Sequence, residues 1–184
     1  MNKIFFLILI LIAITSCSEP IARKPVVRKT SSFMTESIQR NKVLNKMEEA
    51  ILQQIVKKDT LHEYLNSEYG FWYFYKKKQT GNNAFPKAGD EVFFTYEVKN
   101  VQDSILYSKE EIGVKQYKID KQEMITGLQE GIKLMKESEI VTFLFPSHKA
   151  FGYTGLEKIN TNQPLIYTVE LKKIITNNTI NENN

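Results

Sequence analysis

The sequence predicts an α+β domain in which a mostly antiparallel sheet wraps on one central helix, preceded by an N-terminal helical segment. Hydrophobic side chains alternate along residues 91–99, which is typical of a strand with one buried face. Between residues 121 and 136 their spacing changes to three and four, which is the period of a helix. Strand-like runs lie on both sides of that segment, so the order is strands, one helix, strands.

The first residues predict a targeting signal rather than part of the fold. Lys3 precedes an apolar run over residues 4–14, and small residues precede Cys17. This is the pattern of a secretory signal, and the run is much shorter than the roughly 20 residues that span a membrane. Ile14-Thr-Ser-Cys17 resembles the bacterial lipobox, whose Cys is acylated. We therefore expect residues 1–16 to be removed and Cys17 to carry the lipid, palmitate included.

The residues after Cys17 indicate where the lipid would place the chain. Ser18 follows the Cys, which favours the outer membrane in the sorting of enterobacterial lipoproteins. Residues 18–29 carry four bases and one acid, which does not resemble an acidic export tag. We expect a lipid-anchored domain that faces the periplasm. A plain signal peptide with an incidental Cys is the alternative.

The segment before the domain predicts a tether and then a helix. Residues 17–34 contain Pro, Ser, Thr, Lys and Arg, which favours a flexible tether. Residues 35–69 form the N-terminal helical segment, and Thr60 to Glu63 fit a capping box that starts a new turn. Its apolar stripe is formed by Leu44, Met47, Ile51, Leu52, Ile55 and Val56. This stripe can pack on its own sheet or on a second copy, so a homodimer through the helix stays open.

Residues 70–175 are expected to form the domain itself. Strands are predicted at 70–76, 91–99, 105–108, 115–119, 139–145 and 165–175, and the helix at 121–136. Gly127 and Gly131 lie within that helix, which suggests that it approaches the sheet closely. The Asn-rich residues 176–184 are expected to be a disordered tail.

Composition excludes several kinds of chemistry. One Cys gives no intrachain disulfide and no Cys-X-X-Cys motif, and two isolated His residues argue against a metal site. The adjacent acids Glu48-Glu49 and Glu110-Glu111 are best explained as solvated surface residues. A formal net charge of +4 on an exported chain does not indicate nucleic-acid binding. We expect no metal, no cofactor and no catalysis by titrating groups.

Four segments together resemble FKBP-type peptidyl-prolyl cis/trans isomerases. They are Phe85-Pro-Lys-Ala-Gly-Asp-Glu-Val-Phe-Phe-Thr-Tyr96, Lys121-Gln-Glu-Met-Ile-Thr-Gly-Leu-Gln-Glu-Gly-Ile-Lys-Leu-Met135, Ala150-Phe-Gly-Tyr-Thr-Gly155 and Leu165-Ile-Tyr-Thr-Val-Glu-Leu171. They occur in the family's order over about half of the chain. The resemblance implies an FKBP-like sheet around the central helix. The whole layout is similar to the gliding-motility-associated FKBP-like lipoproteins of the Bacteroidota.

The resemblance also implies a substrate pocket. Tyr96 and Tyr167 would be its aromatic walls, Phe151 would overhang it, and the Ile125 N–H would hold a substrate carbonyl. Further substrate contacts would come from Leu106, Tyr107, Met124, Leu128 and Ile159. Taken alone, Leu106 and Leu128 are better explained by core packing.

Two positions depart from the family pattern. Tyr107 stands where the family has an Asp, and Phe151 stands where a loop Tyr donates its hydroxyl, although Tyr153 is near. Each missing hydrogen bond is worth roughly 0.5–1.5 kcal/mol. We therefore expect reduced activity and weak binding of the macrolide inhibitors of the family.

Two functions follow. The first is a lipid-anchored isomerase that acts on proline-containing exported polypeptides, linked to gliding motility or its secretion machinery. The second is an FKBP-fold binding or chaperone module with little isomerase activity, which the substitutions at 107 and 151 favour.

Overall fold

The computed structural model describes residues 30–81 and 84–177. The elements in chain order are α2 (Thr30–Lys58), β1 (Leu65–Asn66), β2 (Trp72–Lys77), β3 (Glu91–Asn100), β4 (Ile105–Tyr107), α3 (Lys109–Ile112), β5 (Lys115–Lys118), α4 (Thr126–Ile132), β6 (Ile140–Phe145), the 3-10 helix η1 (Ser147–Lys149) and β7 (Leu165–Ile175). The expected signal peptide, Cys17 and most of the expected tail lie outside the described residues.

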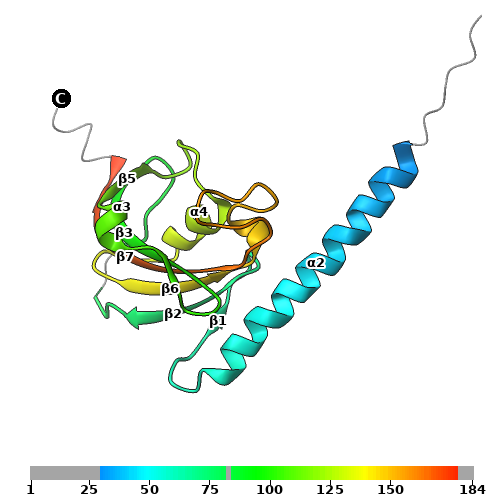
Figure 1. Ribbon diagram of the computed structural model, residues 1–184. Helices are drawn as coiled ribbons and strands as arrows, with labels where there is room; N and C mark the ends of the chain where they lie inside the picture. The colour runs from blue at the N-terminus through cyan, green and yellow to red at the C-terminus, as the bar shows by residue number, and fades with distance from the viewer. Residues whose placement is uncertain (1–29, 82–83, 178–184) are drawn as a thin grey trace, which may run out of the picture. The chain divides into compact units, whose positions relative to one another are not determined.

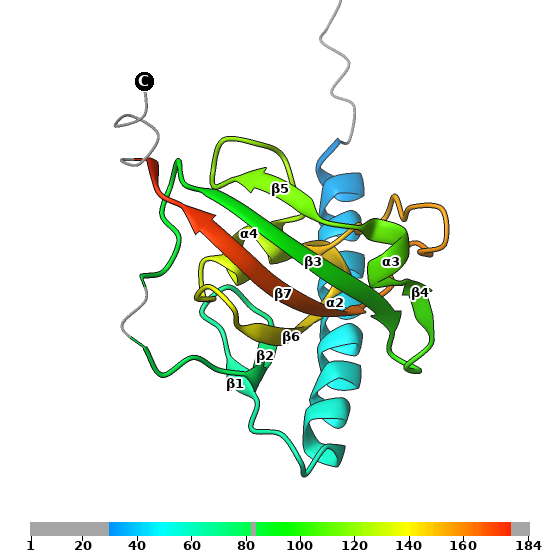
Figure 2. The same ribbon diagram turned by 90° about the vertical axis from the view of Figure 1, so that its left-hand side faces the viewer.

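Seven strands form one antiparallel sheet of order β1-β2-β6-β7-β3-β4, with β5 paired to β3. The long central pair β3 and β7 joins Glu91 with Ile175 at one end and Asn100 with Leu165 at the other. Helix α4 lies against one face of this sheet (Figure 1), and Figure 2 shows β3 and β7 crossing in front of it. The expected α+β architecture is confirmed.

The main core lies between α4 and the facing side of the sheet. Alternate residues of the strands point into it because successive side chains of a strand face opposite sides. Its fully buried members include Phe94, Phe143, Phe145, Tyr167 and Val169 from the sheet and Ile132 from α4. This core fixes which side chains of β3 and β7 can reach the pocket described below.

The close approach of α4 to the sheet was predicted from its glycines and is confirmed. A Cβ added at Gly127 would lie 2.7 Å from the Phe145 ring, and one added at Gly131 would lie 3.0 Å from the Phe143 ring. Helix α4 is shorter than the predicted helix of residues 121–136, since Lys121 to Ile125 precede its first turn without helical structure.

Helix α2 differs from its prediction at both ends. It begins at Thr30, so residues 30–34 of the predicted tether are helical, and it ends at Lys58. The expected capping box at Thr60 does not start a helix. Instead, the Asp59 carboxylate accepts hydrogen bonds from the Leu61 N–H and the Tyr64 hydroxyl and contacts the His62 ring at 2.8 Å. These contacts turn the chain toward β1.

The buried face of α2 also differs from the predicted stripe. Within the compact unit Ile38–Asn184, Leu52 is fully buried and Glu48 is 3% exposed, whereas Met47 and Ile51 are exposed. Glu48 was expected on the solvated surface, and this expectation is wrong. Because Met47 and Ile51 are exposed, they are available to a second copy of the chain. The homodimer through this helix stays a prediction, which sedimentation over a concentration series would test. No helix within the described ranges is long and apolar enough to cross a membrane.

Candidate functional site

A cavity of about 300 Å³ opens between β3, β7, α3 and the loop after η1. It is lined by Tyr96, Val98, Tyr107, Glu111, Ile112, Lys115, Phe151, Leu156, Glu157, Ile159 and Tyr167. Small-molecule sites are typically 300–1,000 Å³ and mostly apolar with a few polar groups. The cavity therefore suits one compact apolar group, such as a proline ring with its neighbouring peptide units.

The inner wall is a row of aromatic rings that continues into the core. The Tyr96 ring stacks on Tyr167 with 5.5 Å between centroids, and Tyr167 lies 5.4 Å from Phe145. Tyr96 also stacks on Phe94 at 5.8 Å. Because Val98 pairs with Tyr167 across the β3–β7 ladder, Tyr96, Val98 and Tyr167 share one sheet face. A rigid wall anchored in the core results.

The tyrosines of the wall are uncharged over the physiological range. Burial raises the pKa of Tyr167, and the neighbouring Tyr96 and Tyr107 raise it further. Burial also raises the pKa of Tyr96, with a smaller contribution from Tyr107. A hydroxyl that stays neutral can donate a hydrogen bond, so this wall does not depend on titration near pH 7.

Tyr107 links β4 to the loop on the opposite side of the cavity. Its hydroxyl donates to Glu157 Oε2 at 3.2 Å and accepts from the Lys158 N–H at 3.3 Å. Lys158 Nζ lies 4.8 Å from the centroid of the Tyr107 ring and 2.6 Å from Glu111 Oε1. The substitution of the family's Asp was expected only to remove a contact, but Tyr107 makes different contacts that join β4 to the loop.

The loop that supplies Leu156, Glu157 and Ile159 is held in a tight turn. Leu156 and Ile159 form an isolated antiparallel bridge. Gly155 has φ +63, and a Cβ there would lie 2.6 Å from the Ile159 carbonyl oxygen. Only glycine fits such a position, so Gly155 sets the path that brings this loop over the cavity.

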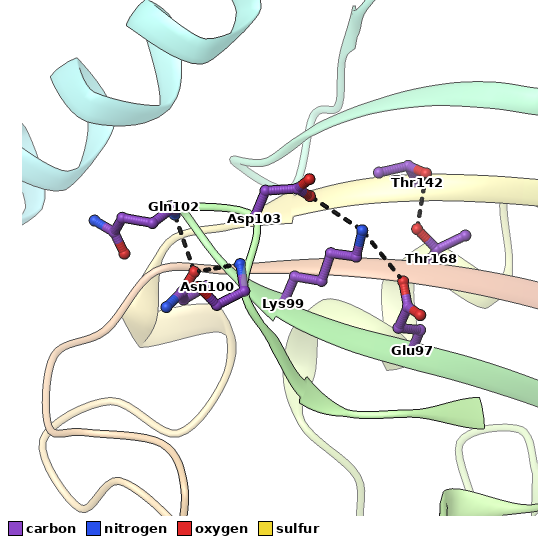
Figure 3. A network of polar contacts seen from close by, with 8 residues as sticks. Glu97, Lys99, Asn100, Gln102, Asp103, Thr142 and Thr168 are labelled. Carbon is purple, nitrogen blue, oxygen red and sulfur yellow. Dashed lines mark hydrogen bonds and ion pairs between the residues drawn. The ribbon is translucent and has the colours of Figure 1, made fainter. Parts of the chain in front are cut away.

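A polar network shapes the turn between β3 and β4 (Figure 3). Tyr107 is the last residue of β4. The Asn100 side-chain oxygen accepts hydrogen bonds from the Gln102 and Ser104 N–H groups. Lys99 Nζ lies 3.1 Å from Asp103 and 3.6 Å from Glu97, and the Asp103 hydrogen bond raises the pKa of Lys99. The turn thereby fixes the start of β4.

Phe151 lies at the cavity, on the loop after η1. It is partly buried and packs against the core. Tyr153 does not replace the hydroxyl that Phe151 lacks, because its side chain is 82% exposed and it lines a separate groove beside α2. The cavity therefore has no tyrosine hydroxyl from this loop.

The structure brings five of the nine predicted pocket residues together at the cavity: Tyr96, Tyr107, Phe151, Ile159 and Tyr167. Leu128 is 2% exposed within the core, and Leu106, Met124 and Ile125 are partly buried against it. None of these four lines the cavity. Ile125 directly precedes α4, and no described residue accepts a hydrogen bond from its N–H. Their roles toward a substrate stay predictions.

Sequence reasoning missed the polar rim of the cavity. Glu111 and Lys115 come from α3 and β5, and Glu157 comes from the loop. A signal existed for α3, since Ser108 and Glu111 have the spacing of a capping box, and the Ser108 hydroxyl indeed accepts from the Glu111 N–H at 3.3 Å. Val98 was on the predicted apolar face of its strand. Only its pairing with Tyr167 was needed to place it in the cavity lining.

In the described part of the chain, no three His, Cys, Asp or Glu side chains gather into a group that could hold a metal ion. What the cavity offers is an apolar aromatic wall, neutral hydroxyls and a charged rim. Such a site can bind an uncharged group at its wall and polar groups at its rim.

Comparisons with known proteins report on the family and the fold of the chain. Residues 82–172 match the model of the FKBP-type peptidyl-prolyl cis-trans isomerase family. A peptidyl-prolyl cis-trans isomerase from Pseudomonas syringae pv. tomato is similar in structure, with a TM-score of 0.59, 19% identity, and coverage of 73% of this chain and 96% of that one. FkpA from Escherichia coli gives a TM-score of 0.58 at 18% identity, covering 95% of this chain and 83% of its own. No curated protein matched the chain. Residues 82–172 therefore form an FKBP-type peptidyl-prolyl cis-trans isomerase domain.

Proposed function

We propose that this chain is a peptidyl-prolyl cis/trans isomerase whose site is the cavity between Tyr96, Tyr167 and Phe151. The single observation that carries the proposal is this aromatic cavity within a domain that matches the FKBP-type family. The proline ring would lie against the Tyr167 wall, and the rim residues would contact the flanking backbone.

The chemistry of prolyl isomerisation does not require an acid or a base to exchange a proton with the substrate. The barrier to peptide rotation is about 18–20 kcal/mol and arises from amide resonance. The twisted transition state has lost that resonance, so its oxygen carries less charge than in the planar amide. An apolar pocket binds the twisted form more favourably than the planar one, and this difference in binding is catalysis. In this proposal the Ile125 N–H, which donates to no described residue, holds a neighbouring substrate carbonyl.

A second candidate is an FKBP-fold binding or chaperone module with negligible isomerase activity. Phe151 favours it, because the hydroxyl that the family places in this loop is missing and Tyr153 points to solvent. Against it stands the linkage at Tyr107, whose hydroxyl joins β4 to Glu157 and Lys158 of the loop although the Asp of the family is missing.

An isomerisation assay with a Leu-Pro peptide separates the two candidates. We expect a measurable rate for the wild type, and Phe151→Tyr should raise it by about twofold to tenfold if one hydrogen bond worth roughly 0.5–1.5 kcal/mol is restored. Tyr107→Asp is measured beside it. No rate in the wild type or in either variant would favour the binding module.

The clients proposed for the domain are proline-containing exported polypeptides. The support is the secretory pattern of residues 1–16 together with the layout of helix and FKBP domain, which resembles the gliding-motility lipoproteins known as GldI. We accordingly propose a link to gliding motility or its secretion machinery. Loss of gliding in a strain lacking the chain, and its restoration by the wild-type gene, would test this link.

The proposed location is a bacterial membrane, with the outer membrane favoured and the domain in the periplasm. Cys17 is the only Cys in the chain, so Cys17→Ser should abolish acyl labelling and release the domain from membranes. Stable anchoring takes more than one acyl chain. A mutant that still takes up labelled palmitate and stays with the membrane fraction would contradict the proposal.

A further inference from the structure

Glu48 of α2 makes an unusual contact with the turn after β6. Its side chain is 3% exposed, and both of its carboxylate oxygens are used by one residue. Glu48 Oε2 accepts from the Ser147 N–H at 2.7 Å, and Oε1 accepts from the Ser147 hydroxyl at 2.7 Å. Hydrogen bonds to a carboxylate are among the stronger ones in proteins. Burying a carboxylate is costly unless it is hydrogen-bonded. Leu52 is already fully buried on the same helix, so the burial of Glu48 is not explained by packing alone.

Ser147 also connects this contact to Phe151. The Ser147 carbonyl accepts from the Ala150 N–H at 2.9 Å and from the Gly152 N–H at 2.8 Å. These two N–H groups belong to the residues on either side of Phe151. The Gly152 carbonyl in turn accepts from the Asn162 N–H at 2.7 Å. The N–H and hydroxyl of Ser147 thus face α2, while its carbonyl holds the loop that supplies the Phe151 wall.

We propose that Glu48 is a positioning residue for the isomerase site, which acts through Ser147 to hold Phe151 at the cavity. This inference rests on the proposed function and adds a residue outside the FKBP-type domain to it. Helix α2 is then part of the working site, because its docking sets where the loop after η1 begins.

The backbone of the loop that contains Phe151 explains why it depends on the contact between Glu48 and Ser147. Ala150 has an irregular backbone, with φ −117 and ψ −111, and Gly152 has φ +54. A loop with these conformations is held by its hydrogen bonds rather than by regular structure. Without the Glu48 acceptors, the Ser147 N–H and hydroxyl are unpaired at a buried position, so the turn would rearrange to reach water.

The test compares Glu48→Ala with Glu48→Gln in the full chain. An amide can accept from the Ser147 N–H and donate to the Ser147 hydroxyl, so Glu48→Gln should keep most of the wild-type activity. Glu48→Ala should lower kcat/KM for a Leu-Pro peptide by about tenfold, because small displacements of a positioning group are costly to catalysis. Glu49→Ala, at an exposed position of the same helix, is the matched control and should leave kcat/KM unchanged.

A second control separates positioning from general loss of stability. Val92→Ala removes fully buried atoms at the far end of β3, which pairs there with Tyr117 and Ile174. It should lower the melting temperature without lowering kcat/KM at a temperature at which the variant is folded. A fall in kcat/KM as large as that of Glu48→Ala would overturn the proposal.

Two readouts report on the turn without relying on activity. Trp72 lines a groove together with Asn45, Glu49, Pro146 and His148, so its fluorescence should change in Glu48→Ala and stay unchanged in Glu48→Gln. Hydrogen exchange at Ala150 and Gly152 should become faster only in Glu48→Ala. If the wild type has no isomerase activity, the proposed function fails while these readouts still test the contact. The inference would be overturned if Glu48→Ala kept the exchange rates and the kcat/KM of the wild type. It would also be overturned if Glu48→Gln lost as much kcat/KM as Glu48→Ala.

Discussion

Tyr96 and Tyr167, which come from the neighbouring strands β3 and β7, stack with 5.5 Å between their ring centroids and 27° between their planes. Tyr167 is 2% exposed, while Tyr96 is only partly buried. One ring is thus a core residue and the other faces the opening. The pair joins the fold to the site, and mutations of its two members are expected to differ.

Substitutions at Tyr167 should separate stability from catalysis. Tyr167→Ala empties a core position, and truncating a large aromatic side chain typically costs about 3–5 kcal/mol of the free energy of unfolding. Tyr167→Ala should therefore lose stability as well as activity, because the ring is buried in the core. Tyr167→Phe should keep the melting temperature close to wild type, so its isomerase rate reports on the hydroxyl alone. A melting temperature of Tyr167→Ala equal to wild type would place this ring outside the core.

The two glycines of α4 should respond differently to Ala. An Ala gains about 1 kcal/mol of helix propensity over Gly, but forcing atoms into a packed core costs about 1–3 kcal/mol. At Gly127 the added Cβ would lie 2.7 Å from the Phe145 ring, so Gly127→Ala should be destabilising. At Gly131 the nearest ring atom lies 3.0 Å away, so Gly131→Ala should be closer to neutral. Chemical denaturation measures both, and the reverse ranking would contradict the packing of α4.

The charged rim should determine which residue the site prefers before proline in the substrate. Glu111 and Glu157 face the cavity together with Lys115, and Glu111 is already paired with Lys158. A Leu-Pro peptide should therefore be turned over faster than a Glu-Pro peptide, whose carboxylate would lie near Glu157. Glu157→Gln should narrow this difference. Equal rates for both peptides with the wild type would count against the cavity as the site.

Activity and stability should depend on pH in different ways. Because burial raises the pKa of both Tyr96 and Tyr167, the isomerase rate should be nearly flat between about pH 6 and 8. Burial lowers the pKa of His148, with Lys149 adding to the shift and Glu48 opposing it. The unfolded chain then binds more protons, so stability should fall as the pH drops through about 6.5. His148→Gln should remove this fall in a melting series, and a bell-shaped rate profile abolished by the same variant would contradict the mechanism.

The strands could be predicted because their signals are local, whereas the aromatic wall of Tyr96 and Tyr167 was implied only by the family resemblance. The alternation of Val92, Phe94, Tyr96 and Val98 gives the buried face of β3 directly. The spacing of Gly127 and Gly131 likewise gives the face of α4 that meets the sheet. The apolar side chains of β3 and the missing side chains of the two glycines each determine which surface can pack against them.

The buried face of α2 and the rim of the cavity could not be predicted in the same way. Glu48 is charged, so its sequence pattern places it on the surface, and its partner Ser147 is 99 residues away. The contacts between Tyr107 and Lys158 also join segments that are distant in the sequence. Such pairs are determined by the tertiary fold, and no local period reports them.

Nuclear magnetic resonance exchange spectroscopy on a Leu-Pro peptide tests the central claim most directly. Uncatalysed exchange between the cis and trans forms takes tens of seconds or more, so exchange cross-peaks that appear on adding a small amount of the protein report catalysis. We expect such cross-peaks, together with chemical-shift changes at Tyr96, Tyr167 and Phe151 on titration with the peptide. An unchanged exchange rate, or shift changes that avoid these three residues, would contradict the account.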